Sequence, residues 1–213
     1  MNRKLAPKTQ EINDINFVMP THYSLNNKIP VYEYNFDTKE VISIDFVLPA
    51  GTYYQLKPLL ATTVLKNLQE GTVLKNSSEI ANEIDYYGAY LQTNIGHNNI
   101  TLSLITLTKN LEQTLPILAD VFLNAQFPEK ELKIYLGREK QNHIINSNKV
   151  ELIASREFHN STLRSSLPTG LAEKNDFDAI TKQDCVDFYK KHYRLEDLTI
   201  LISGGDSEIT NDL

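Results

Sequence analysis

Residues 41–71, VISIDFVLPAGTYYQLKPLLATTVLKNLQEG, contain a strand, a corner and a helix in direct succession. The opening residues alternate between apolar and polar and are rich in β-branched side chains, which predicts a strand that Pro49 and Gly51 end. Apolar residues then recur at every fourth position over 60–68, which predicts a helix that stops at Gly71. The chain therefore mixes strands with amphipathic helices.

The segment before this stretch predicts a second strand. Residues 31–35, VYEYN, have strand composition, and the polar FDTKE that follows predicts a hairpin with residues 41–48. Residues 1–30 are polar and interrupted by prolines, which favours an extended arm over a separate unit.

Downstream, strands and helices come in blocks. Ser77 or Ser78 is expected to cap a helix that Gly88 closes. Thr108 is expected to cap another, in which Pro116 predicts a kink or a late start. The other predicted elements are strands at 89–94, 99–107 and 198–203 and helices at 129–146, 150–158 and after Thr181.

This block order favours an α+β fold with a mostly antiparallel sheet covered by helices on one face. The expected organisation is an arm at 1–30, a single domain at 31–205, and at 206–213 the start of a linker to a second domain.

Composition and charge restrict the function. The chain has 213 residues, of which 41% are hydrophobic and 23% charged, and its formal net charge is −6. This acidic balance argues against nucleic-acid binding. No apolar run approaches the roughly 18 residues of a membrane span, and the first residues lack the apolar middle of a secretory signal. We expect a cytoplasmic protein, although a chain whose secretion leader had been removed would look the same.

The residues that usually carry chemistry form no known pattern. The five histidines never stand in H-E-x-x-H or H-x-x-E-H, and no nucleotide-binding motif occurs. His143 and His159 lie on neighbouring predicted helices, but ordinary histidines are the simpler interpretation. Cys185 lies among apolar helix residues, which indicates a packed thiol. Glutamates such as Glu139 have the spacing of a solvated helix surface.

Several segments together resemble the first domain of the insulinase or pitrilysin family of zinc peptidases, which includes the mitochondrial processing peptidase. The strand and Ala-Gly corner VISIDFVLPAGTYYQ, the helix ending in Gly71-Thr72, and EIDYYGAYLQTN are similar to successive parts of that domain. So are LPILADVFLNAQFPEKEL and AITKQDCVDFYKKHYRLEDLTILISGG. The likeness extends from about residue 31 to residue 205.

The resemblance implies where a zinc site would lie and shows that its residues are replaced. The family carries H-x-x-E-H on the helix that ends at Gly-Thr, and those three positions fall here on Thr62, Leu65 and Lys66. The third ligand, a glutamate, would fall at 141–146, which is QNHIIN. The resemblance therefore implies no bound zinc, no other cofactor and no catalytic residue.

The resemblance then implies a role as the partner of an active peptidase. The family encloses peptides between a catalytic half and a half without zinc. The resemblance thus implies a non-catalytic subunit or half-subunit that pairs with an active homologous zinc peptidase subunit or second domain. Extended peptides would add to the strand edge at Leu91, Gln92, Thr93 and Asn94. Two alternatives stay open: a divergent zinc metallopeptidase that uses other ligands, among them His143 and His159, and a purely architectural subunit.

Overall fold

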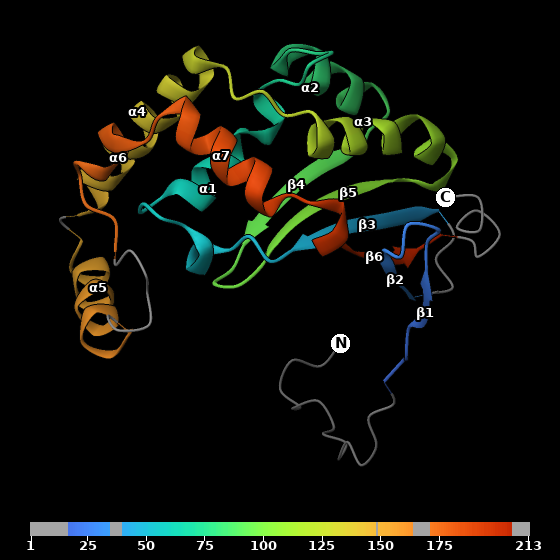
Figure 1. The fold of residues 1–213 in the computed structure, drawn as a ribbon, viewed down its shortest axis with the longest axis horizontal. Helices are drawn as coiled ribbons and strands as arrows, with labels where there is room; N and C mark the ends of the chain where they lie inside the picture. Colours follow the sequence, from blue (N-terminus) through green and yellow to red (C-terminus); the bar gives the residue numbers. More distant parts are fainter. Residues whose placement is uncertain (1–16, 35–39, 148, 164–170, 206–213) are drawn as a thin grey trace, which may run out of the picture.

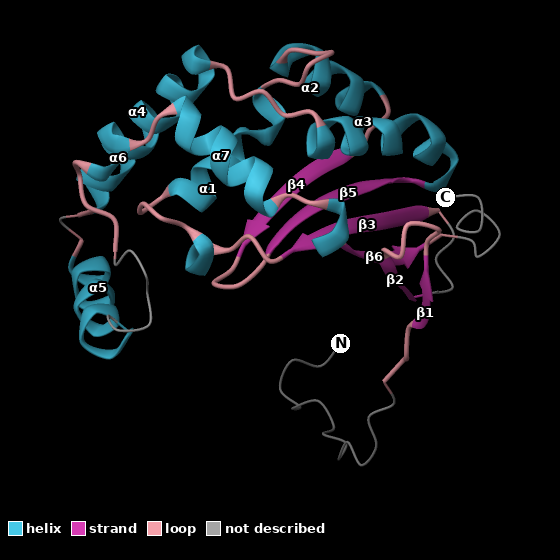
Figure 2. Cartoon of the chain, viewed as in Figure 1, coloured by secondary structure: helices cyan, strands magenta, loops and turns pink. Residues whose placement is uncertain are grey.

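The structure, a computed structural model, describes residues 17–34, 40–147, 149–163 and 171–205. The first part of the expected arm, 1–16, and the expected linker, 206–213, lie outside these residues. Within them a six-stranded sheet carries helices over one face, so the expected α+β architecture is confirmed (Figures 1 and 2).

The sheet has the strand order β1-β2-β6-β3-β5-β4. Its pairs are antiparallel except for β2 with β6, which is parallel. The strands are β1 (Thr21–Ser24), β2 (Pro30–Tyr34), β3 (Val41–Leu48), β4 (Tyr90–Ile95), β5 (Ile100–Leu107) and β6 (Thr199–Gly204).

The α-helices of the described residues begin after the corner that ends β3. They are α1 (Leu60–Asn67), α2 (Ser77–Tyr86), α3 (Leu111–Leu123), α4 (Glu129–Asn146), α5 (Val150–Leu163), α6 (Asp176–Ala179) and α7 (Lys182–His192). The first of them packs against α4 and α7. None of the helices in the described residues is long and apolar enough to cross a membrane.

The predicted hairpin between β2 and β3 is wrong. Strand β6, from the other end of the chain, lies between them and pairs with both. Both edges of β6 are therefore satisfied by strands far away in sequence, and alternation of residue types cannot indicate which strands become neighbours.

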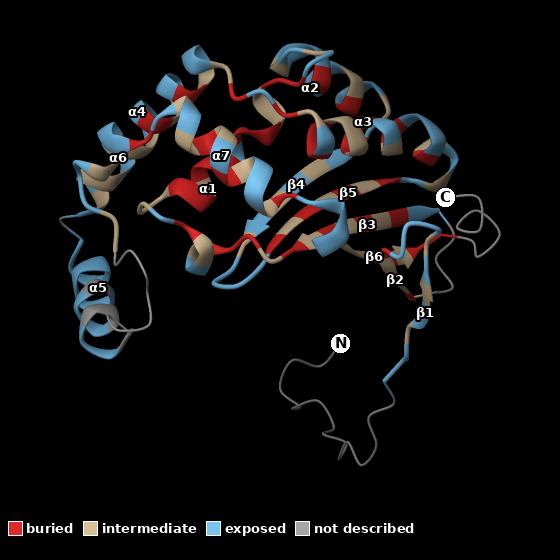
Figure 3. Cartoon of the chain, viewed as in Figure 1, coloured by how far each residue is buried: buried red, intermediate tan, exposed pale blue. Residues whose placement is uncertain are grey.

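The helix-covered face of the sheet is apolar. Ile44 of β3 lies opposite Leu104 of β5, and Phe46 lies opposite Leu102, and all four side chains are buried. The intervening residues face the other side and are less buried, as the alternating colours of β3 and β5 show (Figure 3). This one-sided pattern fits an antiparallel sheet with one covered face.

The corner after β3 needs a residue without a side chain. The Gly51 amide donates to the carbonyl of Asn98 at 3.0 Å, which draws the corner against the β4–β5 turn. A Cβ on Gly51 would lie 2.4 Å from the carbonyl oxygen of His97. This close approach accounts for the glycine and sets the direction in which the chain continues toward α1.

The N-terminus of α2 differs from the prediction at one residue. Asn76, not Ser77 or Ser78, caps the helix, and Asn76 and Glu79 form a reciprocal capping box. Gly88 adopts φ 62° after the helix, as expected for a left-handed stop. Gly71, by contrast, has φ 159° and ψ 146° and pairs with Asn76 in an isolated bridge.

The start of α3 also differs from the prediction. Thr108 begins a short 3₁₀ turn and not the helix itself, which starts at Leu111 and contains Pro116. Of the two outcomes predicted from Pro116, a late start is wrong, because the helix already includes Pro116, and a kink stays a prediction. Thr181, by contrast, caps α7 as predicted and forms a capping box with Asp184.

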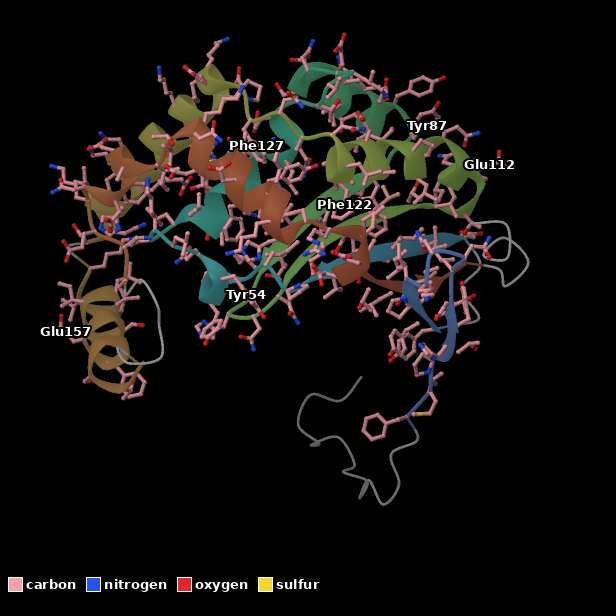
Figure 4. All side chains as sticks on the ribbon, in the orientation of Figure 1. Tyr54, Tyr87, Glu112, Phe122, Phe127 and Glu157 are labelled. Carbon is pink, nitrogen blue, oxygen red and sulfur yellow. The ribbon has the colours of Figure 1, made fainter. Side chains whose placement is uncertain are left out.

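Aromatic side chains fill the layer between the sheet and the helices. Phe46 meets Phe122 edge to face, with ring centroids 5.4 Å apart. The Tyr189 hydroxyl of α7 donates to the Phe122 carbonyl at 2.7 Å, which joins α7 to α3. Figure 4 labels Phe122 in this layer, whereas Glu157 marks α5, which stands apart from the sheet.

Candidate functional site

Helix α1 positions the three residues at which the family resemblance places a metal motif. One side of the helix packs into the core through Leu60, Ala61, Val64 and Leu65, all buried, and Leu68 in the 3₁₀ turn that follows continues this side. Leu59 precedes the helix with φ 70°, so the chain enters α1 through a left-handed residue. The opposite side carries Thr62 and Lys66, which are one helical turn apart and share a face.

Each of the three positions has a definite environment. Thr62 is half-buried and lines a cavity against α4. Leu65 is 0% exposed and part of the hydrophobic core. Lys66 is exposed, and its ammonium donates to the hydroxyl of Thr93 at 2.8 Å and to the Thr93 carbonyl at 3.3 Å.

These groups do not fit a zinc ion. Zinc in a catalytic site needs three protein ligands drawn from imidazole, thiolate and carboxylate, with an acid or base beside the bound water. A buried isobutyl group supplies neither a ligand nor a base at Leu65, and the Lys66 ammonium would repel a cation. These three residues of α1 therefore offer no site for a zinc ion.

The cavity beside Thr62 has a volume of about 260 Å³. It is lined by Leu59, Thr62, Thr63, Tyr135, Leu136, Glu139, Asn142, His143, Asn146 and Phe177. The structure thus brings Asn142, His143 and Asn146 from the 141–146 window to the same space as Thr62. It also places Glu139 there, which the sequence analysis assigned to a solvated surface because helical spacing does not show what faces a residue.

Burial and the charges around the cavity shift the pKa of Tyr135. Burial, and then the negative charge of Glu139, raise the pKa of Tyr135 to about 12, although Arg138 opposes this. The Tyr135 hydroxyl therefore stays protonated at neutral pH and can donate a hydrogen bond into the cavity. Arg138 itself pairs with Glu139 at 3.2 Å.

The residues expected to bind peptide lie on the last strand of the sheet. Strand β4 pairs only with β5 among the described strands, so one of its edges has no strand beside it. Leu91 and Thr93 are half-buried toward the helices, whereas Gln92 and Asn94 are exposed. The Lys66 contact with Thr93 joins α1 directly to this strand.

A groove of about 500 Å³ runs beside the start of β4. It is lined by Gln69, Glu70, Ser77, Ser78, Ile80, Ala81, Ile84, Asp85, Ala89, Tyr90 and Leu91. Burial, and then the charge of Glu131, raise the pKa of Glu70, while Arg138 lowers it. Glu70 and Asp85 are the acidic residues of this groove, which includes Tyr90, and the Lys66 ammonium contacts the strand further along, at Thr93.

The other sequence candidates do not form a cluster in the structure. His143 stacks obliquely on Phe177, with ring centroids 5.4 Å apart. His159 lies on α5, and its side chain is outside the described residues. Cys185 is fully buried. Across the described part of the chain, no group of three or more His, Cys, Asp and Glu residues could hold a metal ion.

Comparison with known proteins identifies the family. The insulinase family, peptidase family M16, matches residues 65–173, and the chain belongs to this family. The matched stretch begins within α1 and runs past α5, so it includes β4 and the α4 side of the cavity.

Two relatives that are named zinc proteases align with most of this chain. The chain is 25% identical over 190 residues to an uncharacterized zinc protease of Rickettsia felis, covering 84% of this chain and 45% of that protein. It is 24% identical over 186 residues to an uncharacterized zinc protease of Rickettsia bellii, with the same coverage. The chain therefore spans about half the length of these curated relatives.

Two solved structures share the fold. A peptidase M16 inactive domain from Pseudomonas fluorescens matches with a TM-score of 0.83 and 19% identity, covering 92% of this chain and 48% of that chain. A protease from Helicobacter pylori matches with a TM-score of 0.78 and 16% identity, covering 92% and 49%. At these identities the similarity shows the fold alone.

Proposed function

We propose that this chain is a non-catalytic peptidase-like domain that binds extended peptides along β4 and pairs with an active homologous zinc peptidase half. The observation that carries the proposal is the environment of the three residues at which the resemblance places the zinc motif: Thr62 lines a cavity, Leu65 is fully buried and Lys66 is bonded to Thr93. The membership in the insulinase family and the match to an inactive domain of the same family support it.

The pairing with a second, active half is inferred from the lack of zinc ligands at Thr62, Leu65 and Lys66. A domain without ligands for zinc can contribute to peptide hydrolysis only by binding, positioning or enclosing the substrate. The relatives are about twice as long as this chain, which supports a second half as the structural complement of the domain. The unpaired edge of β4 supports peptide addition, since main-chain hydrogen bonds would supply affinity with little demand on sequence.

The test combines metal analysis with peptide binding. Protein purified without chelator is expected to contain far less than one zinc ion per chain and to show no peptide cleavage that a chelator abolishes. Near-stoichiometric zinc together with chelator-sensitive cleavage would disprove the non-catalytic assignment.

Amide hydrogen exchange tests the peptide site separately. A bound extended peptide is expected to slow exchange at residues 91–94 of β4, where main-chain groups become paired. Binding in the absence of such protection would contradict the β4 site, and protection would argue against a purely architectural subunit.

One observation favours a second candidate, the divergent zinc metallopeptidase. Glu139 and His143 line the same cavity as Thr62, so two groups that ligate metals lie close to the family's metal position. Peptide cleavage that is lost in the double variant His143→Ala, His159→Ala, but retained in Glu129→Gln on the outer side of α4, would support this candidate.

A further inference from the structure

The ammonium of Lys66 lies at the edge where a peptide would add to β4. It reaches this edge from α1 by donating two hydrogen bonds to Thr93, one to the hydroxyl at 2.8 Å and one to the main-chain carbonyl at 3.3 Å. These contacts hold the charged end of an exposed side chain at a defined place on the strand.

The positive charge of Lys66 is not neutralised within the part of the chain that the structure describes. The ion pairs there join other lysines, such as Lys57 with Asp184 and Lys75 with Glu83, and none includes Lys66. An ammonium has three donors, and Thr93 uses two of them. One donor and the charge are therefore available to a group placed beside β4.

The contact between Lys66 and Thr93 limits which peptides can bind along β4 at Thr93. A strand that added to β4 and continued past Thr93 would compete with Lys66 for the Thr93 carbonyl. A peptide that ends beside Thr93 does not need the Thr93 carbonyl. Its terminal carboxylate instead accepts a charge-assisted hydrogen bond from the Lys66 ammonium. Glu70 and Asp85, in the groove that includes Tyr90, would repel a carboxylate placed there instead.

We propose that Lys66 anchors the C-terminal carboxylate of an extended peptide bound along β4, so that the domain prefers peptides that end at Thr93. This inference rests on the proposed function, because it requires peptides to add to β4. It specifies the ligand further: a peptide with a free carboxyl terminus, like the product of a cleavage, and not a continuous chain.

Fluorescence anisotropy with matched peptides tests the inference. The probe is a short labelled peptide of alternating threonine and valine, prepared once as the free acid and once as the C-terminal amide. The free acid is expected to bind about fivefold more tightly, which is the upper range for an exposed ion pair, and the difference is expected to shrink at high salt. Because this comparison uses the unchanged protein, it does not depend on the folding of a variant.

Variants then assign the effect to one residue. Lys66→Met is expected to bind the two peptides equally, at the affinity of the amide, whereas Lys109→Met, at an exposed lysine of another element, retains the difference. Equal binding of acid and amide to the unchanged protein would overturn the inference and leave the proposed function standing. If both peptides bound Lys66→Met more tightly than the unchanged protein, the inference would also be overturned, because Lys66 would then be blocking the free edge of β4.

Two further outcomes separate the sources of the effect. An amidated peptide that ends in glutamate, if it binds as tightly as the free acid, would assign Lys66 to side-chain carboxylates and overturn the assignment to the terminus. Binding of neither peptide would overturn this inference together with the β4 part of the proposed function.

Discussion

The Lys57 ammonium lies 2.7 Å from the Asp184 carboxylate and joins the segment before α1 to the first turn of α7. Asp184 also accepts hydrogen bonds from the amide and hydroxyl of Thr181, at 2.8 and 2.7 Å. The Asp184 carboxylate thus completes the capping box of α7 and ties the helix to the segment that leads into α1.

The Asp184 contacts predict a loss of stability in acid. Partial burial alone would raise the pKa of Asp184, but hydrogen bonds from Lys57 and Thr181, with the charge of Lys57, hold the pKa below its usual value. The stabilisation is therefore complete above the unfolded pKa of about 3.9 and is lost as pH falls through the lower folded pKa. Urea unfolding as a function of pH is expected to show this loss in the unchanged protein and less of it in Asp184→Asn. Asp187→Asn, at an exposed position of α7, serves as the control and should keep the acid dependence.

Replacing Leu65 with the glutamate that the family resemblance places at this position is expected to destabilise the fold. Leu65→Glu would bury a carboxyl group in the core without a partner and should destabilise the fold by about 3–5 kcal/mol. Leu65→Met keeps the volume and should cost less than about 1.5 kcal/mol. Denaturant unfolding measures both, and a Leu65→Glu variant as stable as Leu65→Met would show that this side of α1 is not core.

Gly51 and Gly137 form a matched pair for alanine substitution. Gly51→Ala should destabilise by about 1–3 kcal/mol, because its Cβ meets the His97 carbonyl in the folded corner. Gly137 lies in α4, and a Cβ added there would have no neighbouring atom within 4 Å, so Gly137→Ala should stabilise by about 0.5–1 kcal/mol. Thermal unfolding of the two variants should therefore shift in opposite directions, and a shift in the same direction would contradict this account.

Cys185 is expected to be unreactive in the folded protein. Burial, and then the charge of Asp184, raise the pKa of the Cys185 thiol to about 12, with Lys57 opposing. Little thiolate exists near pH 8, and the sulfur is inaccessible. A chromogenic disulfide reagent should label the chain slowly in buffer and rapidly in denaturant. Fast labelling under native conditions would show that α7 opens or packs differently.

Much of the local structure follows from the sequence. The bounds of α4 follow from charge and apolar spacing, the stop at Gly88 from its freedom to adopt positive φ, and the cap of α7 from Thr181 and Asp184. Each of these depends on atoms within one helical turn of one another. The resemblance to the insulinase family also predicts that Thr62, Leu65 and Lys66 stand where that family carries its zinc motif, and this assignment stays a prediction.

The tertiary structure decided how these pieces meet. It placed β6 between β2 and β3, turned Glu139 into the cavity with Thr62, and put the Lys66 ammonium on Thr93. The physical reason is that periodicity determines which side of a strand or helix is apolar, whereas the neighbour it packs against depends on contacts between residues far apart in the chain.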